Sequence, residues 1–258
     1  MMRRFFAVAL LFGGLLAAPA QTTLRIAAAA DLGPVLPPIL ASFETQTGIH
    51  AEATYQASAM LTTEILNGAP FDVFLSADLS YPQKLIDAAA ADAKDLGPAA
   101  SPVIYAKGTL VLWARHNTAV PAPSLDLLRS PALQRLAIAN PDRAPYGRAA
   151  VAALQSLKLY DALKPKIVTA ENISQTAQFA DTGNADAGLI SLTSAMTAKL
   201  SADGAYWTVP ANLYPPIEQG AVIVSKTTQR QSALRFLQYL LSPAVQAELK
   251  KSGLTPAR

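Results

Sequence analysis

Short apolar runs alternate with amphipathic segments along almost the whole chain, and this alternation restricts the fold more than any other feature of the sequence. The apolar runs predict eight β-strands, at residues 23–28, 49–55, 71–77, 108–114, 135–139, 166–170, 186–191 and 220–225. The clearest helix is predicted over residues 227–242, where one face carries Ala233, Phe236, Leu237, Leu240 and Leu241. Strands that alternate with helices predict an α/β fold with mostly parallel sheets flanked by helices, in which ligands bind beyond the carboxyl ends of the strands.

The N-terminus has the pattern of a cleaved secretory signal. Arg3 and Arg4 precede an apolar stretch over residues 5–18, and the small-x-small sequence of residues 18–20 comes just before Gln21. A membrane anchor needs about 20 apolar residues, so this stretch is too short for one. We therefore expect a signal peptide over residues 1–20, export to the periplasm, and a mature chain that begins near Gln21.

The charge balance and the lack of cysteine exclude several classes of protein. The full chain has 21 Lys and Arg residues against 18 Asp and Glu, and removal of the two signal arginines leaves 19 against 18, a net charge of +1. This balance predicts no nucleic-acid partner. Because the sequence has no cysteine, it can form neither disulfides nor thiolate metal sites, and its stability must come from its hydrophobic core.

Four loops that follow predicted strands share one chemistry, because each carries small or hydroxyl residues just where a helix is expected to begin. These loops contain Ala30-Asp31, Ala57-Ser58-Ala59, Pro145-Tyr146-Gly147 and Asn172-Ile173-Ser174. Helix N-termini present backbone N–H groups and the positive end of the helix dipole, so several that converge make a site for an anion. The alternative is that Asp31, Ser58 and Asn172 are ordinary N-caps, which any α/β protein needs.

Motifs for enzymatic chemistry are absent from the sequence. It contains no G-x-S-x-G, no G-x-G-x-x-G and no P-loop, and His50 and His116 stand singly beside strands without a cluster of metal-ligating neighbours. Ser58 has no candidate base near it in the sequence. A binding protein is therefore favoured over an enzyme, although a hydrolase or transferase on the same scaffold stays open as the rival class.

The order of motifs along the chain resembles that of the periplasmic molybdate-binding proteins of ABC transporters. The matching stretches are AAAADL, ASFETQTGI, YQASAMLTTEILNGAPFDVFLSAD and NPDRAPYGRAA, and the match extends over residues 23–253. The resemblance implies two α/β lobes joined by two crossover strands, with a tetrahedral oxyanion held between them by hydroxyl and backbone N–H groups. It also implies molybdate or tungstate as the ligand, no cofactor, a membrane permease as the partner, and a monomer.

The resemblance also implies a discontinuous domain order. The crossings are expected near residues 103–113 and 217–224. The first lobe then contains residues 21–104 and 220–258, and the second lobe contains residues 105–219.

The family's binding positions can be carried over one by one. Ser58 is expected to donate its hydroxyl and its N–H to the anion, while Tyr146 and Ile173 are expected to donate their backbone N–H groups. Two positions depart from the family: Ser191 stands where a tyrosine is frequent, and Asp31 stands where a serine is common. These five residues form the expected oxyanion site, and no side chain is expected to ligate the metal atom directly.

Asp31 raises a difficulty for anion binding, because an ionised carboxylate about 4 Å from one negative charge costs about 4 kcal/mol at an effective dielectric constant near 20. We favour the interpretation that Asp31 is an N-cap whose carboxylate folds back onto its own helix, while its backbone N–H and that of Ala30 face the ligand. The alternative is that Asp31 marks a changed ligand, such as a protonated oxyanion or a cation. Arg143 or Arg148 is a candidate to offset its charge.

Overall fold

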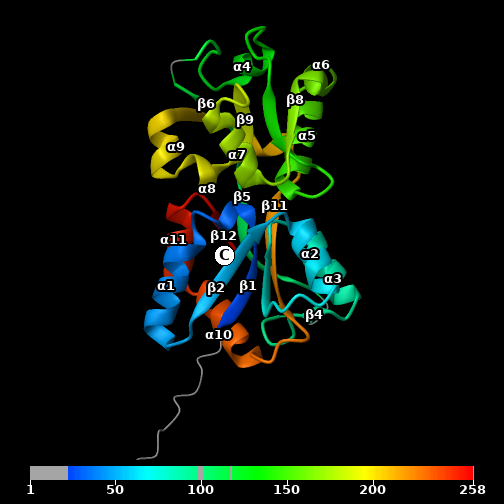
Figure 1. The fold of residues 1–258 in the computed structure, drawn as a ribbon, viewed down its shortest axis with the longest axis vertical. Helices are drawn as coiled ribbons and strands as arrows, with labels where there is room; N and C mark the ends of the chain where they lie inside the picture. Colours follow the sequence, from blue (N-terminus) through cyan, green and yellow to red (C-terminus); the bar gives the residue numbers. More distant parts are fainter. Residues whose placement is uncertain (1–22, 98–100, 117, 258) are drawn as a thin grey trace, which may run out of the picture.

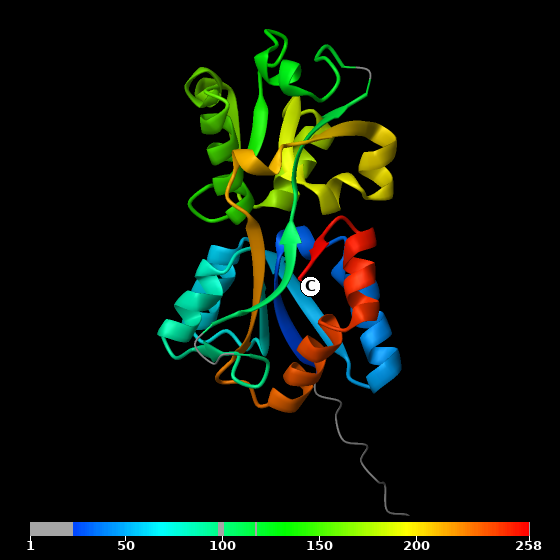
Figure 2. The same ribbon diagram turned by 180° about the vertical axis from the view of Figure 1, so that it is seen from behind.

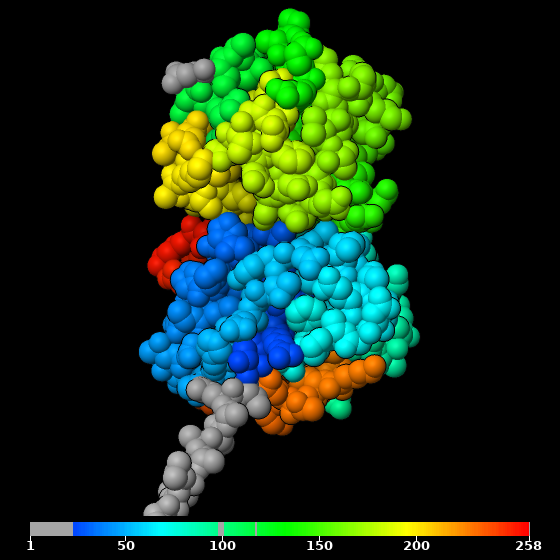
Figure 3. Space-filling model, in the orientation of Figure 1, coloured from blue at the N-terminus to red at the C-terminus, as the bar shows by residue number. Residues whose placement is uncertain are grey.

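The chain forms two lobes, each built on its own β-sheet (Figure 1). The computed structural model describes residues 23–97, 101–116 and 118–257, so the signal peptide expected over residues 1–20 lies outside the described residues. In this described part, no helix is both long and apolar enough to cross a membrane. Atoms of the two lobes meet at the waist of the molecule, as Figure 3 shows.

The first lobe contains a seven-stranded sheet in the order β12-β5-β11-β3-β1-β2, with β4 paired to β11. Its strands are β1 (Leu24–Ala29), β2 (Ala51–Gln56), β3 (Val73–Ser76), β4 (Ala91–Asp92), β5 (Val103–Gly108), β11 (Ile217–Val224) and β12 (Thr255–Pro256). β1 runs parallel to β2 and β3, whereas β11 runs antiparallel to β3 and β5. The carboxyl ends of β1, β2 and β3 therefore lie at one edge of the sheet, and this edge faces the second lobe (Figure 1).

Helices cover both faces of this sheet because successive strand residues point to opposite sides. Its helical segments are η1 (Ala30–Leu32), α1 (Leu36–Thr47), α2 (Ser58–Leu66), α3 (Ser80–Asp87), α10 (Arg230–Leu240) and α11 (Pro243–Lys251). Ile26 packs with Phe43 of α1 and Phe236 of α10 in one core cluster. The next residue, Ala27, packs with Leu61 of α2 in another cluster.

The second lobe contains a five-stranded sheet in the order β10-β6-β9-β7-β8. Its strands are β6 (Leu110–Arg115), β7 (Leu136–Ala139), β8 (Ile167–Ala170), β9 (Ala187–Ser191) and β10 (Gly204–Thr208). Its helical segments are α4 (Leu125–Arg129), α5 (Pro145–Ser156), α6 (Tyr160–Leu163), η2 (Lys164–Lys166), α7 (Ile173–Thr182), α8 (Leu192–Ala195), α9 (Ala198–Asp203) and η3 (Ala211–Leu213). β7 runs parallel to β8 and β9, so their carboxyl ends share one edge of the sheet.

The chain passes between the sheets twice, from β5 to β6 through Thr109 and from β10 to β11 through residues 209–216. β5 and β11 pair antiparallel and lie side by side in Figure 2. β5 leads toward the second lobe, and β11 leads back from it. β5 belongs to the first sheet as far as its last residue, Gly108, and β11 belongs to it from its first residue, Ile217. The division into residues 21–104, 105–219 and 220–258 stays a prediction, and the sheets change a few residues inside the expected second lobe.

The predicted α/β fold class is confirmed, and each of the eight predicted strands corresponds to a strand of the structure. The helix predicted over residues 227–242 is α10, and Ala233, Phe236, Leu237 and Leu240 of its predicted apolar face are buried. The apolar pattern missed the short strands β4 and β12 and the longer strands β5 and β10, although the crossover strand expected from the resemblance near residues 103–113 covers β5. β10 lies at a sheet edge with only Gly204 fully buried, so it lacks the apolar run that marks the other strands.

Candidate functional site

A small cavity lies between the lobes, where the carboxyl ends of the strands and the starts of several helices meet. It has about 210 Å³ of empty space. The residues that line it come from both lobes and are Ala29, Ala30, Asp31, Gln56, Ala57, Ser58, Ala77, Ala144, Pro145, Tyr146, Asn172 and Ile173. All four loops singled out in the sequence therefore contribute to one cavity.

Three α-helices begin at this cavity, together with the single 3-10 turn of η1. α2 begins at Ser58 and α5 at Pro145, and neither has a side-chain hydrogen bond at its cap. α7 begins at Ile173, and the Asn172 side chain caps it by accepting from the Gln175 backbone N–H at 3.0 Å. Since first-turn N–H groups have no partner inside a helix, those of Ser58, Tyr146 and Ile173 are suited to hold an anion.

Ser58 is fully buried and is the first residue of α2 rather than its N-cap, which is Ala57. The alternative that Ser58 is an ordinary N-cap is therefore wrong, whereas the same alternative for Asn172 is confirmed. The Ser58 Oγ accepts a hydrogen bond from the Ala77 backbone N–H at 3.1 Å. An oxygen that accepts in this way still has its own proton to donate, so the hydroxyl can serve a ligand in the cavity.

Tyr146 joins the two lobes through its side chain. It lies in the first turn of α5, is buried, and donates its hydroxyl proton to Asp31 Oδ2 at 3.0 Å. Burial, together with the nearby Asp31 charge, raises the pKa of Tyr146 well above its usual value, so the phenol stays protonated and can only donate to the carboxylate. Its backbone N–H stays free for the cavity, because a first-turn N–H has no partner inside the helix.

The expectation that the Asp31 carboxylate caps its own helix is wrong. The cap of η1 is Ala29, and Asp31 is a residue of the turn itself. Its Oδ2 instead accepts from Tyr146 of the other lobe and from Gln219 Nε2 of the crossover strand β11. The carboxylate therefore points toward α5 and β11 rather than along its own helix, and Asp31 is fully buried.

Burial raises the pKa of Asp31 to about 6, with the hydrogen bonds from Gln219, from Tyr146 and from its own backbone N–H acting in the opposite direction. The second carboxylate oxygen, Oδ1, is buried and has no hydrogen-bond partner in the described part of the chain, and the same is true of Gln219 Oε1. Gln219 was not among the residues predicted for the site from the sequence. A polar residue inside the apolar run of residues 217–224 was the signal that could have found it.

Ser191 lies at the end of β9 and serves as the N-cap of α8, where its Oγ accepts from the Ser194 N–H at 3.2 Å and donates to the Ser194 Oγ at 2.9 Å. It does not belong to the lining of the cavity, and its contact with a ligand stays a prediction. Thr193, which the sequence did not single out, donates its hydroxyl to the Asp31 carbonyl at 2.8 Å. The structure thus brings Asp31, Ser58, Tyr146 and Ile173 together and places Ser191 behind them.

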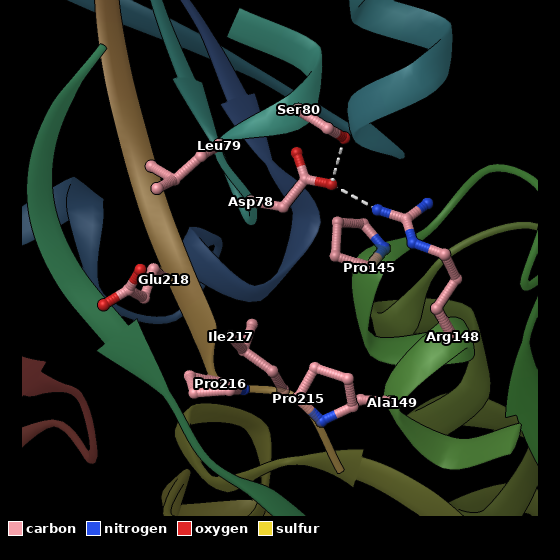
Figure 4. A pocket seen from close by; sticks show the side chains of 10 residues that line it. All are labelled: Asp78, Leu79, Ser80, Pro145, Arg148, Ala149, Pro215, Pro216, Ile217 and Glu218. Carbon is pink, nitrogen blue, oxygen red and sulfur yellow. Dashed lines mark hydrogen bonds and ion pairs between the residues drawn. The ribbon is translucent and has the colours of Figure 1, made fainter. Parts of the chain in front are cut away.

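Further contacts hold the lobes together around the cavity. Ser174 Oγ of α7 donates to the Ala30 carbonyl at 2.8 Å, and the Ala59 N–H of α2 donates to the Arg143 carbonyl at 3.2 Å. The Arg148 guanidinium of α5 forms an ion pair with Asp78, which follows β3 (Figure 4). This set of contacts describes a closed arrangement of the lobes.

Neither arginine proposed to offset the charge of Asp31 does so. Arg148 pairs with Asp78, and Arg143 pairs with Glu171 at 2.9 Å. Figure 4 shows that the Arg148 ion pair lies at a larger hollow beside residues 215–218, where the chain returns to the first lobe. This hollow has about 780 Å³ of empty space. Its charged residues already have partners, including Glu218 with Lys107 at 2.9 Å. The starts of α3 at Ser80 and of α5 at Pro145 line it, against three α-helix starts and η1 at the smaller cavity, so we assign the site to the smaller cavity.

Comparison with known proteins agrees with this geometry. A family model described as "Bacterial extracellular solute-binding protein" matches residues 24–255. The chain belongs to this family. Molybdate-binding protein ModA of Azotobacter vinelandii is 37% identical over 248 residues, covering 95% of both chains, and its Rhodobacter capsulatus counterpart is 37% identical over 96% of this chain and 93% of its own.

The fold has a solved counterpart among these relatives. The structure of the Azotobacter vinelandii periplasmic molybdate-binding protein superimposes with a TM-score of 0.83 and 32% identity, covering 91% of this chain and all of the other. The resemblance to periplasmic molybdate-binding proteins is therefore confirmed, and these relatives are named as binding proteins rather than enzymes.

Proposed function

We propose that this protein is an extracytoplasmic receptor that binds molybdate, and also tungstate, in the interlobe cavity and delivers it to the membrane permease of an ABC transporter. The observation that carries the proposal is the convergence of helix starts from both lobes on one small buried cavity. Fixed N–H dipoles from opposite sides suit a tetrahedral oxyanion, because each ligand oxygen meets donors without the need for a full counter-charge.

Each lobe supplies part of the shell around the ligand. Ser58 supplies a hydroxyl and a backbone N–H from the first lobe, and Tyr146 and Ile173 supply backbone N–H groups from the second. Ala30 adds an N–H group from the turn after β1. Ser191 is a further proposed contact, for which its hydroxyl proton would have to leave the Ser194 Oγ. An anion bound by both lobes favours the closed arrangement, because only that arrangement completes the set of donors.

The chemistry of the cavity favours binding over catalysis. Among the residues that line it there is no histidine, and the Ser58 Oγ contacts the Ala77 N–H, whereas the Asp31 carboxylate contacts Tyr146 and Gln219. A nucleophile needs a base within hydrogen-bond reach, and no hydrogen bond joins Ser58 to Asp31 in the described residues. We therefore propose a receptor without enzymatic activity or cofactor. We further propose that it is located in the periplasm and acts as a monomer without a nucleic-acid partner.

Thermal denaturation of the mature protein with four sodium salts tests the proposal. Molybdate and tungstate should each raise the melting temperature, because a ligand that binds the native state alone stabilises it, whereas sulfate and phosphate should change it little. Equal stabilisation by all four anions would indicate an unselective anion site, and no response to molybdate would refute the proposal. The Ser58→Ala variant should give a smaller molybdate shift than the wild type.

A further inference from the structure

The two oxygens of the buried Asp31 carboxylate have different surroundings. Oδ2 accepts hydrogen bonds from the Tyr146 hydroxyl and from Gln219 Nε2. Oδ1 is buried without a partner, and the carbonyl oxygen of the Gln219 amide is in the same state within the described chain. The two side-chain donors both hold Oδ2, which leaves Oδ1 as the atom that Asp31, a residue of the cavity lining, can offer to a ligand.

An unpartnered acceptor in a buried site is unfavourable, since it has lost its hydrogen bonds to water and gained none in the protein. An ionised carboxylate accepts hydrogen bonds but cannot donate one, and the same holds for an oxyanion without a proton. Two such groups therefore cannot form a hydrogen bond with each other. A protonated carboxyl group removes this conflict. Its carbonyl oxygen accepts two hydrogen bonds, as Oδ2 does, and its hydroxyl donates one.

The groups around Asp31 leave it as the site for a proton. The titratable side chains that interact with it are phenols, Tyr146 of α5 and Tyr105 of β5, and burial raises the pKa of both well above the usual value. No cation forms an ion pair with Asp31 in the described residues.

The elements packed against η1, the turn that contains Asp31, include α7, α8 and β2. The charged Asp181 of α7 pairs with Lys199, α8 has no charged residue, and Glu52 of β2 lies beside His50.

We propose that Asp31 is protonated when the oxyanion is bound and that its Oδ1–H donates a hydrogen bond to a ligand oxygen, so that the receptor takes up one proton with each oxyanion. The inference rests on the proposed function, because it places that oxyanion in the cavity beside Asp31. The proton comes from solvent and ends on Oδ1, and no covalent bond of the ligand breaks.

The direction of the pH effect follows from the burial of the group. Burial raises the pKa of Asp31 to about 6, and a bound anion raises it further, because the anion disfavours the carboxylate. Below this pKa the proton is already present before the ligand binds, and above it each binding event must take up a proton. If the protonated form alone binds, the binding-competent fraction falls from one half at pH 6 to about one hundredth at pH 8, a loss of affinity of about 50-fold.

Calorimetric titration of the mature protein with sodium molybdate between pH 6 and pH 8 tests the inference. Titrations in two buffers with different ionisation enthalpies give the number of protons taken up. The wild type should take up nearly one proton at pH 8 and lose about 50-fold in affinity from pH 6 to pH 8. Asp31→Asn should take up none and show a flat affinity, because its amide carries no titratable proton and can donate from Nδ2.

Ser58→Ala is the matched control, because it removes a donor from the same cavity without touching the carboxyl group. It should bind more weakly at every pH and keep the proton uptake of the wild type. The proton count of the wild type needs no variant, so the test stands even if Asp31→Asn fails to fold.

Three outcomes would overturn the inference. Molybdate binding by the wild type with flat affinity and no proton uptake would refute it while the proposed function stands. Proton uptake that persists in Asp31→Asn would place the proton on another group and refute it likewise. A wild type that binds no molybdate at any pH would refute the proposed function and this inference together.

Discussion

Replacement of Ser58 by alanine separates the ligand contact of its hydroxyl from its structural contact. A hydrogen bond to a charged group contributes about 1.5–3 kcal/mol, so loss of the hydroxyl should weaken molybdate binding by about 10- to 100-fold. The Ser58 Oγ also accepts from the buried Ala77 N–H at 3.1 Å. Its removal leaves that donor unpaired, which should lower the free energy of unfolding of the unliganded protein by about 1–3 kcal/mol.

Two assays on the same preparation measure these effects. Calorimetric titration gives the dissociation constant for molybdate, and urea denaturation without ligand gives the free energy of unfolding. Ser156→Ala is a matched control, because its hydroxyl donates to the Leu213 carbonyl at 2.9 Å in an exposed position outside the cavity. The control should bind molybdate like the wild type. Lower stability of Ser58→Ala with unchanged affinity would show that the hydroxyl serves the fold alone, and it would refute the assigned role.

Three further variants test other parts of the site. Tyr146→Phe removes a hydrogen bond that lowers the pKa of Asp31, so the fall in molybdate affinity should move to higher pH, and a calorimetric pH series that shows no upward shift would contradict the reasoning. Gly147→Ala places a methyl group against the backbone of β7, which should lower the free energy of unfolding by about 1–3 kcal/mol in urea denaturation. Gly97→Ala is its control, because the added methyl group meets no atom and the free energy of unfolding should stay unchanged. Arg148→Gln breaks an ion pair between the lobes and should speed molybdate release in stopped-flow measurements. The affinity loss should stay below tenfold, because the Arg148 side chain is 42% exposed, and an unchanged release rate would show that the pair does not hold the lobes closed.

The sequence predicted the parts of the fold that carry strong apolar patterns. The central strands, such as β3, are buried along their whole length, and their runs of apolar residues are therefore visible. β10 escaped prediction because it is an edge strand whose Tyr206 and Thr208 are exposed. β5 escaped because its six residues include only two buried ones, Tyr105 and Ala106.

The candidate site was predictable where its chemistry depends on the backbone. Ser58, Tyr146 and Ile173 lie at the starts of helices, and local sequence determines where a helix starts. The direction of the Asp31 carboxylate was not predictable, because its partners Tyr146 and Gln219 lie 115 and 188 residues away along the chain. A helix cap was the nearest partner in the sequence, whereas the closed lobes supply donors from outside the segment.

The position of molybdenum in a crystal of the mature protein tests the central claim most directly. Anomalous diffraction from crystals grown with sodium molybdate locates the metal atom without reference to the protein coordinates. We expect one strong peak in the interlobe cavity, with ligand oxygens within hydrogen-bond distance of the Ser58 Oγ and of the Tyr146 and Ile173 backbone N–H groups. A peak elsewhere on the protein, or none at all, would contradict the claim that this cavity is the oxyanion site.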